Sequence, residues 1–277
     1  MLARDLADEA GRLLLDLRAR GGDPDVLRKA GDRLSHEFLA ERLAGARPRD
    51  VVLSEEGIDD KARLSADRVW IVDPLDGTRE FGEDGRTDWA VHVALWERSA
   101  VGRTVGGLTA GAVALPAQGQ VLSTAVPAGD PGGRIGPVGH GANLAGPVGH
   151  GASNELGAEA LERPLRLVVS RSRAPRLVHD VAGRLGAELV PCGSAGAKVA
   201  TVITGQTDAY LHAGGFYEWD TAAPVAVATQ AGFHVSRIDG TPVAYNQDDP
   251  FLPDILVCRP AIAGLLLYAI REATDAI

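Results

Sequence analysis

The second half of the chain alternates between short apolar segments of strand length and longer apolar segments of helix length. This alternation begins at Leu165 and favours an α/β layer, in which helices cover a sheet. The predicted strands are 165–170, 187–190, 208–212, 233–236 and 255–258, and the predicted helices are 175–186, 195–205, 220–231 and 260–272.

The first half has a different order of elements. Leu6, Leu13, Leu14 and Leu17 recur at helical spacing and predict an amphipathic helix over 2–20. Short apolar or alternating segments then read as strands bounded by polar residues. The remaining predicted elements are a helix at 32–44 and strands at 51–53, 69–72, 89–96, 107–115 and 119–123. We expect an α+β half.

Residues 126–163 separate the two halves and are rich in Gly, Pro and Ala. The segment G-P-V-G-H-G-A occurs at 136–142 and again at 146–152. Such a stretch buries little apolar surface and predicts a flexible insertion. We therefore expect an N-terminal half (1–125), the insertion, and a C-terminal half (164–277) that act as one catalytic unit. The histidines of the repeat leave a metal-binding or partner-binding tail open as an alternative to a spacer.

Net charge and composition limit the classes of molecule that the protein is expected to bind. The net charge is −9, which disfavours DNA or RNA as a partner but leaves small phosphate esters open if a bound metal supplies local positive charge. No apolar stretch approaches the length of a membrane span, and the charged N-terminus lacks the apolar core of a signal peptide, so a cytoplasmic protein without a membrane partner is expected. Two distant cysteines favour neither a disulfide framework nor a zinc site.

The strongest local signal is the run W-I-V-D-P-L-D-G-T at 70–78. Pro74 lacks a backbone donor and ends a buried strand, and Gly77 permits a tight turn. Asp73 and Asp76 then project from one strand end, where a divalent cation with hard oxygen ligands, such as Mg²⁺, would bridge them. Residues from Gly77 onward would open a helix whose N–H groups face an anion. The alternative is an ordinary turn with a helix cap.

Two further acidic clusters lie at the ends of predicted elements. Glu55 follows the strand 51–53, and Asp220 opens the helix 220–231 after a glycine-rich turn. Asp220 has the simpler alternative of a helix N-cap. Because each cluster lies at an element end, all three are able to converge on one pocket.

The run at 70–78 and the segment W-D-T-A-A at 219–223 together resemble the two signatures of the lithium-sensitive, magnesium-dependent phosphatases. That family includes inositol monophosphatase, fructose-1,6-bisphosphatase and the 3′-phosphoadenosine 5′-phosphate phosphatases. The resemblance covers residues 5–260 apart from the insertion. It implies a layered αβαβα sandwich and lithium sensitivity, and it leaves the choice between monomer and homodimer open.

The resemblance also implies a metal site for two or three Mg²⁺ ions. Glu55, Asp73 and the carbonyl of Leu75 would hold one ion. Asp73, Asp76 and Asp220 would hold the second, and a third, weaker ion would rest on Glu55. Two metals about 3.5–4 Å apart would clamp the phosphate and activate a water for in-line attack.

Catalytic roles follow from the same resemblance. Asp32 and Thr78 would orient and deprotonate the attacking water, and Glu55 would support it through the metal. Backbone N–H groups of Gly77 and Thr78, beside Asp76, would hold the phosphate. Lys29 stands where the family commonly has threonine, which weakens the assignment of Asp32, and a helix N-cap is its alternative role.

Three places bear on the substrate. Arg79-Glu80-Phe81 is similar to the nucleotide-phosphatase branch of the family, often called CysQ, whereas inositol phosphatases more often carry Thr-Asn-Phe. His212 stands where inositol phosphatases usually have a glutamate that would bind ring hydroxyls. An equally simple reading is that His212 merely ends a strand.

The third place is a set of polar residues after two predicted strands. Ser170 and Arg171 are similar to a segment of the nucleotide branch, where arginine would meet a second phosphate by bidentate pairing. A solvated surface pair is the alternative. Gly193, Ser194 and Lys198 match a family turn that would contact the ribose or base, although any strand-to-helix junction needs such a turn.

The sequence therefore predicts a Mg²⁺-dependent phosphoric monoester hydrolase. Its expected substrate is a small phosphorylated nucleotide, adenosine 3′,5′-bisphosphate, cleaved at the 3′-phosphate to give AMP and phosphate, with the sulfated form as a further substrate. Inositol 1-phosphate or fructose 1,6-bisphosphate is the alternative within the class. A non-catalytic, metal-dependent protein that binds a phosphorylated ligand is the alternative from another class.

Overall fold

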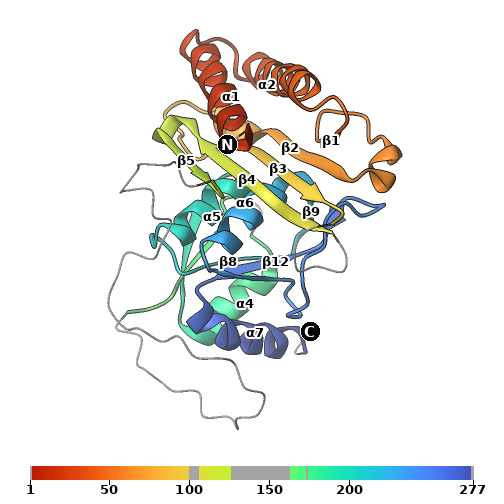
Figure 1. Cartoon of the computed structure of the whole chain (residues 1–277). Coiled ribbons are helices and arrows are strands. Elements are labelled where there is room, and N and C mark those ends of the chain that lie inside the picture. Colours follow the sequence, from red (N-terminus) through yellow and green to blue (C-terminus); the bar gives the residue numbers. More distant parts are fainter. Residues whose placement is uncertain (1, 100–105, 126–162, 173, 276–277) are drawn as a thin grey trace.

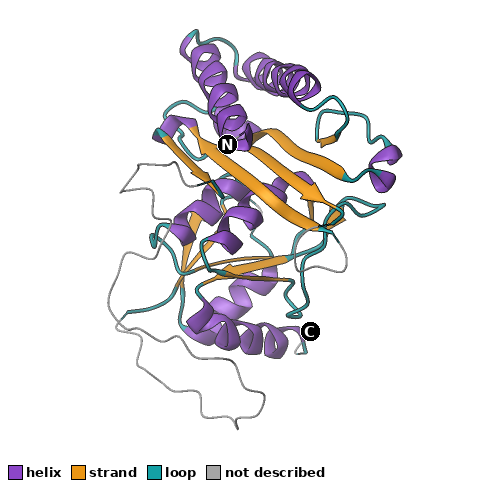
Figure 2. Ribbon diagram, viewed as in Figure 1, coloured by secondary structure: helices purple, strands orange, loops and turns teal. Residues whose placement is uncertain are grey.

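The computed structural model describes residues 2–99, 106–125, 163–172 and 174–275. Figure 1 shows five layers, helices alternating with sheets, and Figure 2 shows the same view by secondary structure. The helices are α1 (Leu2–Ala19), α2 (Pro24–Ala46), α3 (Thr78–Phe81), α4 (Arg176–Leu185), α5 (Ala195–Ile203), α6 (Glu218–Gln230) and α7 (Pro260–Thr274), with short 3₁₀ helices η1 (Lys61–Ser65) and η2 (Pro116–Gln118).

The first sheet is formed by the N-terminal half. Its strand order follows the chain, and only the first pair of strands is parallel. Its strands are β1 (Val51–Ser54), β2 (Arg68–Asp76), β3 (Ala90–Glu97), β4 (Gly107–Leu115) and β5 (Gln120–Ser123).

The second sheet belongs to the C-terminal half and is mixed. In the order β10-β12-β8-β6-β7, the pairs β6–β7 and β6–β8 are parallel and the other two pairs are antiparallel. Its strands are β6 (Arg166–Ser170), β7 (Glu188–Cys192), β8 (Ala209–His212), β10 (His234–Ser236) and β12 (Ile255–Cys258), and a separate two-stranded ribbon pairs β9 (Phe216–Tyr217) with β11 (Phe251–Leu252).

Three buried apolar clusters hold the layers together. One lies between α1, α2 and the first sheet, and another lies between the second sheet and the helices α4 and α7. The middle cluster contains residues of both sheets and of the helices α5 and α6 between them. Because each sheet is covered on both faces, the predicted αβαβα sandwich is confirmed.

The strand β3 illustrates this double burial. Trp89, Val91 and Val93 pack into the cluster under α1 and α2, as their alternation predicts. Ala94 and Trp96 point the other way, into the middle cluster. The second face is therefore apolar too, which alternation alone did not indicate.

The helix α2 begins earlier than the sequence analysis expected. The Asp23 carboxylate accepts hydrogen bonds from the N–H groups of Asp25 and Val26, and Pro24 occupies the first helical position. Asp32 therefore lies inside the helix, and its alternative reading as an N-cap is wrong.

The insertion, with its repeat and its histidines, lies outside the described residues apart from Arg163. That residue pairs with the buried Asp208 through two hydrogen bonds of 2.7 and 2.8 Å. Among the described helices, none combines the length and apolar character that crossing a bilayer requires.

Candidate active site

The strand β2 brings the acidic run into the middle of the molecule. It is buried almost throughout, and its pairing with β3 shifts register between Asp73 and Asp76. The Leu75 N–H donates to the Asp73 carboxylate at 3.0 Å, and Gly77 then turns the chain with a φ of +85° into α3. The predicted turn and the helix after it are therefore present, and both carboxylates lie beside the same strand end.

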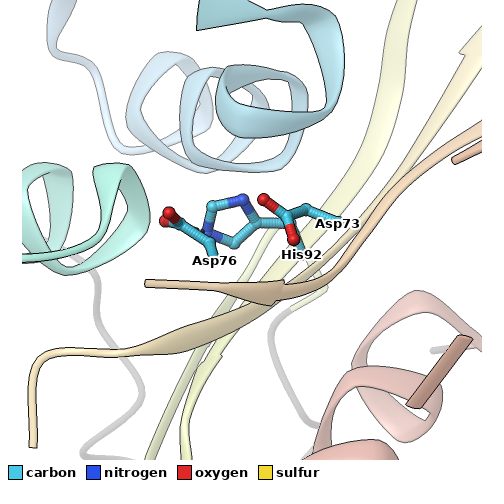
Figure 3. Close-up of side chains that lie close together, drawn as sticks. All are labelled: Asp73, Asp76 and His92. Atoms are coloured by element: carbon cyan, nitrogen blue, oxygen red, sulfur yellow. Dashed lines mark ion pairs between the residues drawn. The ribbon is translucent and has the colours of Figure 1, made fainter. Parts of the chain in front are cut away.

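A third side chain joins these two acids. Figure 3 shows the imidazole of His92 between Asp73 and Asp76, and a ligand atom of each residue lies within 4.8 Å of the others. His92 is not among the predicted site residues. Its signal was present, because it is a histidine in the otherwise apolar segment W-A-V-H-V-A-L-W.

Two more carboxylates act electrostatically on this cluster. Burial, together with repulsion from Asp76, Glu55 and Asp220, raises the pKa of Asp73 well above its usual value. Glu55 follows β1 at the exposed edge of the cluster, yet solvent exclusion at its carboxyl and repulsion from Asp220 and Asp76 raise its pKa to about 7. Burial and Asp76 raise the pKa of Asp220 to about 6. The four acids thus converge as predicted.

Asp76 differs from the other three acids. Burial acts to raise its pKa, but His92, Lys198 and a hydrogen bond from Ser194 outweigh burial and lower the pKa to about 2. Asp76 therefore stays ionised, whereas the raised pKa values of Asp73 and Glu55 favour their protonated forms. One negative charge is fixed, and the others become available when a cation arrives.

The donor set fits a hard divalent cation. The second carboxylate oxygen of Asp73 is buried without a hydrogen-bond partner, which is costly unless something positive binds it. Several carboxylates at one strand end are the ligands that Mg²⁺ prefers. Glu55, Asp73, Asp76 and Asp220, together with the Leu75 carbonyl, would hold such an ion and polarise a bound phosphate.

Asp220 is not the N-cap of its helix, which was the simpler alternative for its role. The helix α6 begins at Glu218 with Tyr217 as its N-cap, so Asp220 lies inside the first turn. Its carboxylate accepts a hydrogen bond of 2.7 Å from the Tyr217 N–H. Asp220 therefore stabilises the helix start and still contributes its charge to the cluster.

Thr78 and Asp32 meet at the entrance to the cluster. The Thr78 hydroxyl lies 3.2 Å from an Asp32 carboxylate oxygen and 3.0 Å from the Leu75 carbonyl oxygen. Burial and the charge of Glu56 raise the pKa of Asp32 to about 6, against the lowering effect of the Thr78 hydrogen bond. A carboxyl with this pKa is able to exchange a proton near neutral pH.

The turn before α5 closes the cluster from the C-terminal half. Ser194 has a φ of +44°, and its hydroxyl donates to Asp76 at 2.5 Å while accepting from the Ala197 N–H. The ammonium of Lys198 donates to the carbonyls of Gly193 and Ser194 at 3.0 and 2.6 Å. Lys198 is thus fully buried beside the acids and holds the strained turn in place.

A cavity of about 510 Å³ opens next to these residues. It is a size that suits a small ligand. Six of the predicted site residues line it: Asp76, Ser170, Ser194, Lys198, His212 and Asp220. Aromatic side chains form much of the remaining wall: Tyr210, Phe216, Tyr217 and Phe251. Two of these, Tyr217 and Phe251, are about half exposed.

The two predicted arginines lie outside the cavity lining. Arg79 is largely exposed and lies 3.8 Å from Glu83. Arg171 forms ion pairs of 2.9 Å with Glu80 and 2.7 Å with Glu83. Arg171 is therefore neither a freely solvated side chain nor in contact with the cavity, and Glu80 and Glu83 hold it beside Ser170.

The sequence profile of the Inositol monophosphatase family matches residues 6–274. The chain belongs to the inositol monophosphatase family. It is a phosphatase of that family, and the fold and the acidic cluster described above agree with this assignment.

Three relatives illustrate where the chain lies within the family. It is 48% identical to a 3′-phosphoadenosine 5′-phosphate phosphatase of Mycobacterium leprae, over 98% of this chain and 93% of the relative. It is 28% identical to the 3′(2′),5′-bisphosphate nucleotidase CysQ of Shigella flexneri, over 89% and 94% of the two chains. The crystal structure of CysQ from Bacteroides thetaiotaomicron superimposes with a TM-score of 0.70 at 26% identity, covering 93% of this chain and 95% of that one.

Proposed function

We propose that this phosphatase removes the 3′-phosphate of adenosine 3′,5′-bisphosphate, and of its 5′-phosphosulfate form, to give AMP or adenylyl sulfate. Water supplies hydroxyl to the phosphorus, and the leaving 3′-oxygen takes up a proton. The observation that carries the proposal is the 48% identity, over nearly the full length of both chains, to the mycobacterial phosphatase named for this substrate.

The cavity supports a nucleotide. Its aromatic wall offers flat apolar surfaces to a purine, and the rings of His212 and Phe216 lie with centroids 4.2 Å apart. A sugar phosphate without a base would leave this wall uncovered. Ser170, Ser194 and Lys198 line the same cavity and bring polar groups to the ribose side in our proposal.

Magnesium is the working ion in our proposal, with two or three ions at the acidic cluster. Bound there, the metal would supply Lewis-acid activation of the attacking water and charge neutralisation at the phosphate. Protons held by Glu55 and Asp73 would pass to the solvent on cation binding, whereas Asp220, with a pKa of about 6, is already mostly ionised at neutral pH. The Leu75 carbonyl contributes a neutral oxygen.

The proton of the attacking water passes to the pair formed by Thr78 and Asp32. The hydroxyl is already within hydrogen-bonding distance of the carboxylate. With a pKa of about 6, Asp32 accepts a proton at neutral pH and releases it again without a large cost. Gly77 and Thr78, at the start of α3, present N–H groups to the phosphate oxygens.

The test compares substrates under one set of conditions. We expect kcat/KM on adenosine 3′,5′-bisphosphate with Mg²⁺ to exceed that on inositol 1-phosphate and fructose 1,6-bisphosphate by a factor of about 100 or more, as expected when polar and stacking contacts are lost. A higher value on either sugar ester would overturn the nucleotide assignment. Asp76→Asn, expected to fold and to lose turnover, separates enzyme activity from a contaminating phosphatase.

We further propose that the enzyme acts in the cytoplasm. One further outcome of the substrate comparison bears on the alternative of a non-catalytic protein. Turnover of none of the three esters, with tight Mg²⁺-dependent binding of the nucleotide, would favour the non-catalytic binding protein.

A further inference from the structure

His92 is a buried side chain next to the acidic cluster, and the proposed reaction gives it no role. It lies on β3 and has no exposed surface. Its Nδ1 lies 3.3 Å from the carbonyl oxygen of Trp219, the residue before Asp220, and its Nε2 lies 3.2 Å from Oδ2 of Asp76. The ring thus connects one acidic residue of β2 to the start of the helix that carries another (Figure 3).

Three groups converge on a single oxygen of Asp76. The Ser194 hydroxyl and the Gly196 N–H donate hydrogen bonds to Oδ2 at 2.5 and 2.9 Å, and Nε2 of His92 lies 3.2 Å from the same atom as an electrostatic contact that does not complete a hydrogen bond. None of these three contacts falls on Oδ1. The carboxylate is therefore anchored through Oδ2, and Oδ1 is the oxygen left for a cation.

Gly196 makes this arrangement sterically feasible. A Cβ at this position would lie 2.1 Å from Nε2 of His92 and 2.9 Å from a methyl carbon of Val113. Both neighbours are buried in the strand layer, so a side chain at this position would force the imidazole or the backbone of α5 to shift. A glycine inside α5 weakens the helix, so its presence here is explained by the close approach of the histidine ring.

We propose that His92 is a positioning residue that makes Asp76 a one-oxygen ligand and thereby favours Mg²⁺ over Ca²⁺. This inference rests on the metal-dependent phosphatase function proposed above. Ca²⁺ binds six to eight oxygens and often takes both oxygens of a carboxylate, whereas Mg²⁺ requires near-octahedral geometry with shorter bonds. An aspartate whose Oδ2 already has other contacts offers only Oδ1 to a cation. Such a ligand suits Mg²⁺ better than Ca²⁺.

The test measures metal binding without substrate. Titration calorimetry of the intact protein with Mg²⁺ and with Ca²⁺ gives two dissociation constants, and the fluorescence of the adjacent Trp219 provides a second readout. His92→Leu removes the ring nitrogens at similar volume. We expect it to weaken Mg²⁺ binding by about tenfold, the lower end of the effect seen when a metal ligand loses an outer-shell partner, and to weaken Ca²⁺ binding less.

Two further variants separate positioning from packing. His92→Gln places an amide nitrogen near the position of Nε2, and we expect it to retain most of the preference for Mg²⁺. Gly196→Ala pushes the ring away from Asp76 and leaves His92 chemically intact, and we expect it to behave like His92→Leu. It also serves as the deciding variant if His92→Leu does not fold.

Two results would overturn the proposal. One is an unchanged ratio of the Mg²⁺ and Ca²⁺ dissociation constants in Gly196→Ala and His92→Leu. The other is an equal loss in His92→Gln and His92→Leu. Because no nucleotide enters this experiment, its outcome is independent of whether adenosine 3′,5′-bisphosphate proves to be the substrate.

Discussion

The hydroxyl of Thr78 lies 3.2 Å from the carboxylate of Asp32, although the two residues are 46 positions apart in the chain. The same hydroxyl lies 3.0 Å from the carbonyl of Leu75. A hydroxyl has one hydrogen to donate, so it serves one acceptor at a time. In the mechanism proposed for this enzyme, the pair passes a proton between water and carboxyl, and the contact with the Leu75 carbonyl keeps the hydroxyl in place.

Thr78→Ala removes this connection. We expect kcat on adenosine 3′,5′-bisphosphate to fall by about 10²- to 10⁴-fold, the usual range for a lost proton-transfer partner, while KM and the Mg²⁺ dissociation constant change little. Thr78→Ser keeps the hydroxyl and is the matched control, with kcat near that of the wild type. Equal losses in both variants would assign Thr78 a packing role instead.

Metal binding should release protons. Below a pH of about 7, Glu55 is largely protonated in the metal-free protein, and Asp220 titrates near 6. A cation displaces these protons, so the apparent affinity for Mg²⁺ should rise between pH 6 and 8, by up to about tenfold per pH unit for each proton displaced. Calorimetry in buffers of different ionisation enthalpy counts the protons.

Asp32→Asn is the control for that measurement, because Asp32 titrates in the same range but lies outside the set of expected ligands. We expect this variant to release nearly as many protons as the wild type. An affinity independent of pH across this interval would contradict the raised pKa values of the cluster.

The stability of the metal-free protein should fall as the pH rises, whereas the affinity for Mg²⁺ should increase. The folded pKa values of Glu55 and Asp220 lie above their usual values of 4.5 and 3.8, so their contribution to stability is full below pH 4 and is lost as the pH rises through 6 and 7. We expect the Tm in EDTA to fall between pH 5.5 and 8, and saturating Mg²⁺ to abolish most of this fall. A Tm in EDTA that rises over the interval would contradict the prediction.

Asp73→Asn should raise the stability of the metal-free protein and abolish its stabilisation by Mg²⁺. Asp73 is buried, repelled by three acids, and has one oxygen without a partner. Replacing its carboxyl with an amide of the same shape removes the repulsion, and we expect the Tm in EDTA at pH 8 to rise by at least about 2 °C, the shift expected for about 1 kcal/mol in a chain of this size. The variant should gain no stability from Mg²⁺, whereas the wild type should.

Substitution of Arg171 tests whether this side chain binds the 5′-phosphate of the substrate. Glu80 and Glu83 hold its guanidinium beside Ser170, which lines the cavity. We expect Arg171→Ala to lower kcat/KM on adenosine 3′,5′-bisphosphate by about tenfold or more, and on adenosine 3′-monophosphate much less, because only the first substrate has a 5′-phosphate to pair. Arg79→Ala, on the same surface, is the matched control. Equal losses on both substrates would make Arg171 a structural anchor for α3.

Much of the architecture was predictable from local patterns. The strand at 107–115 and the helix at 195–205 match β4 and α5 to within two residues, because apolar periodicity reflects which face an element buries. The ribbon of β9 and β11 was not predicted. Its strands pair two residues each across a long separation in the chain, and such short segments carry no period.

The candidate site was predictable wherever acids follow a strand. Glu55, Asp73, Asp76 and Asp220 converge as the sequence indicated, because each lies at or beside the end of a regular element. His92 was missed, since its role depends on two contacts made by residues far along the chain, at Trp219 and Gly196. The pairing of Arg171 with the buried Glu80 and with Glu83 was also not predictable, because the choice of ion-pair partners depends on tertiary structure.

The middle apolar cluster has a consequence for how the chain reaches its folded state. The carboxylates of β1 and β2 come from one half, that of α6 comes from the other, and this cluster is where both halves pack together. The proposed ligand set would therefore be complete only after contacts of high sequence separation have formed, and such contacts form slowly in folding. Magnesium should accordingly lower the unfolding rate constant far more than it raises the folding rate constant. It would then lengthen the lifetime of the folded enzyme.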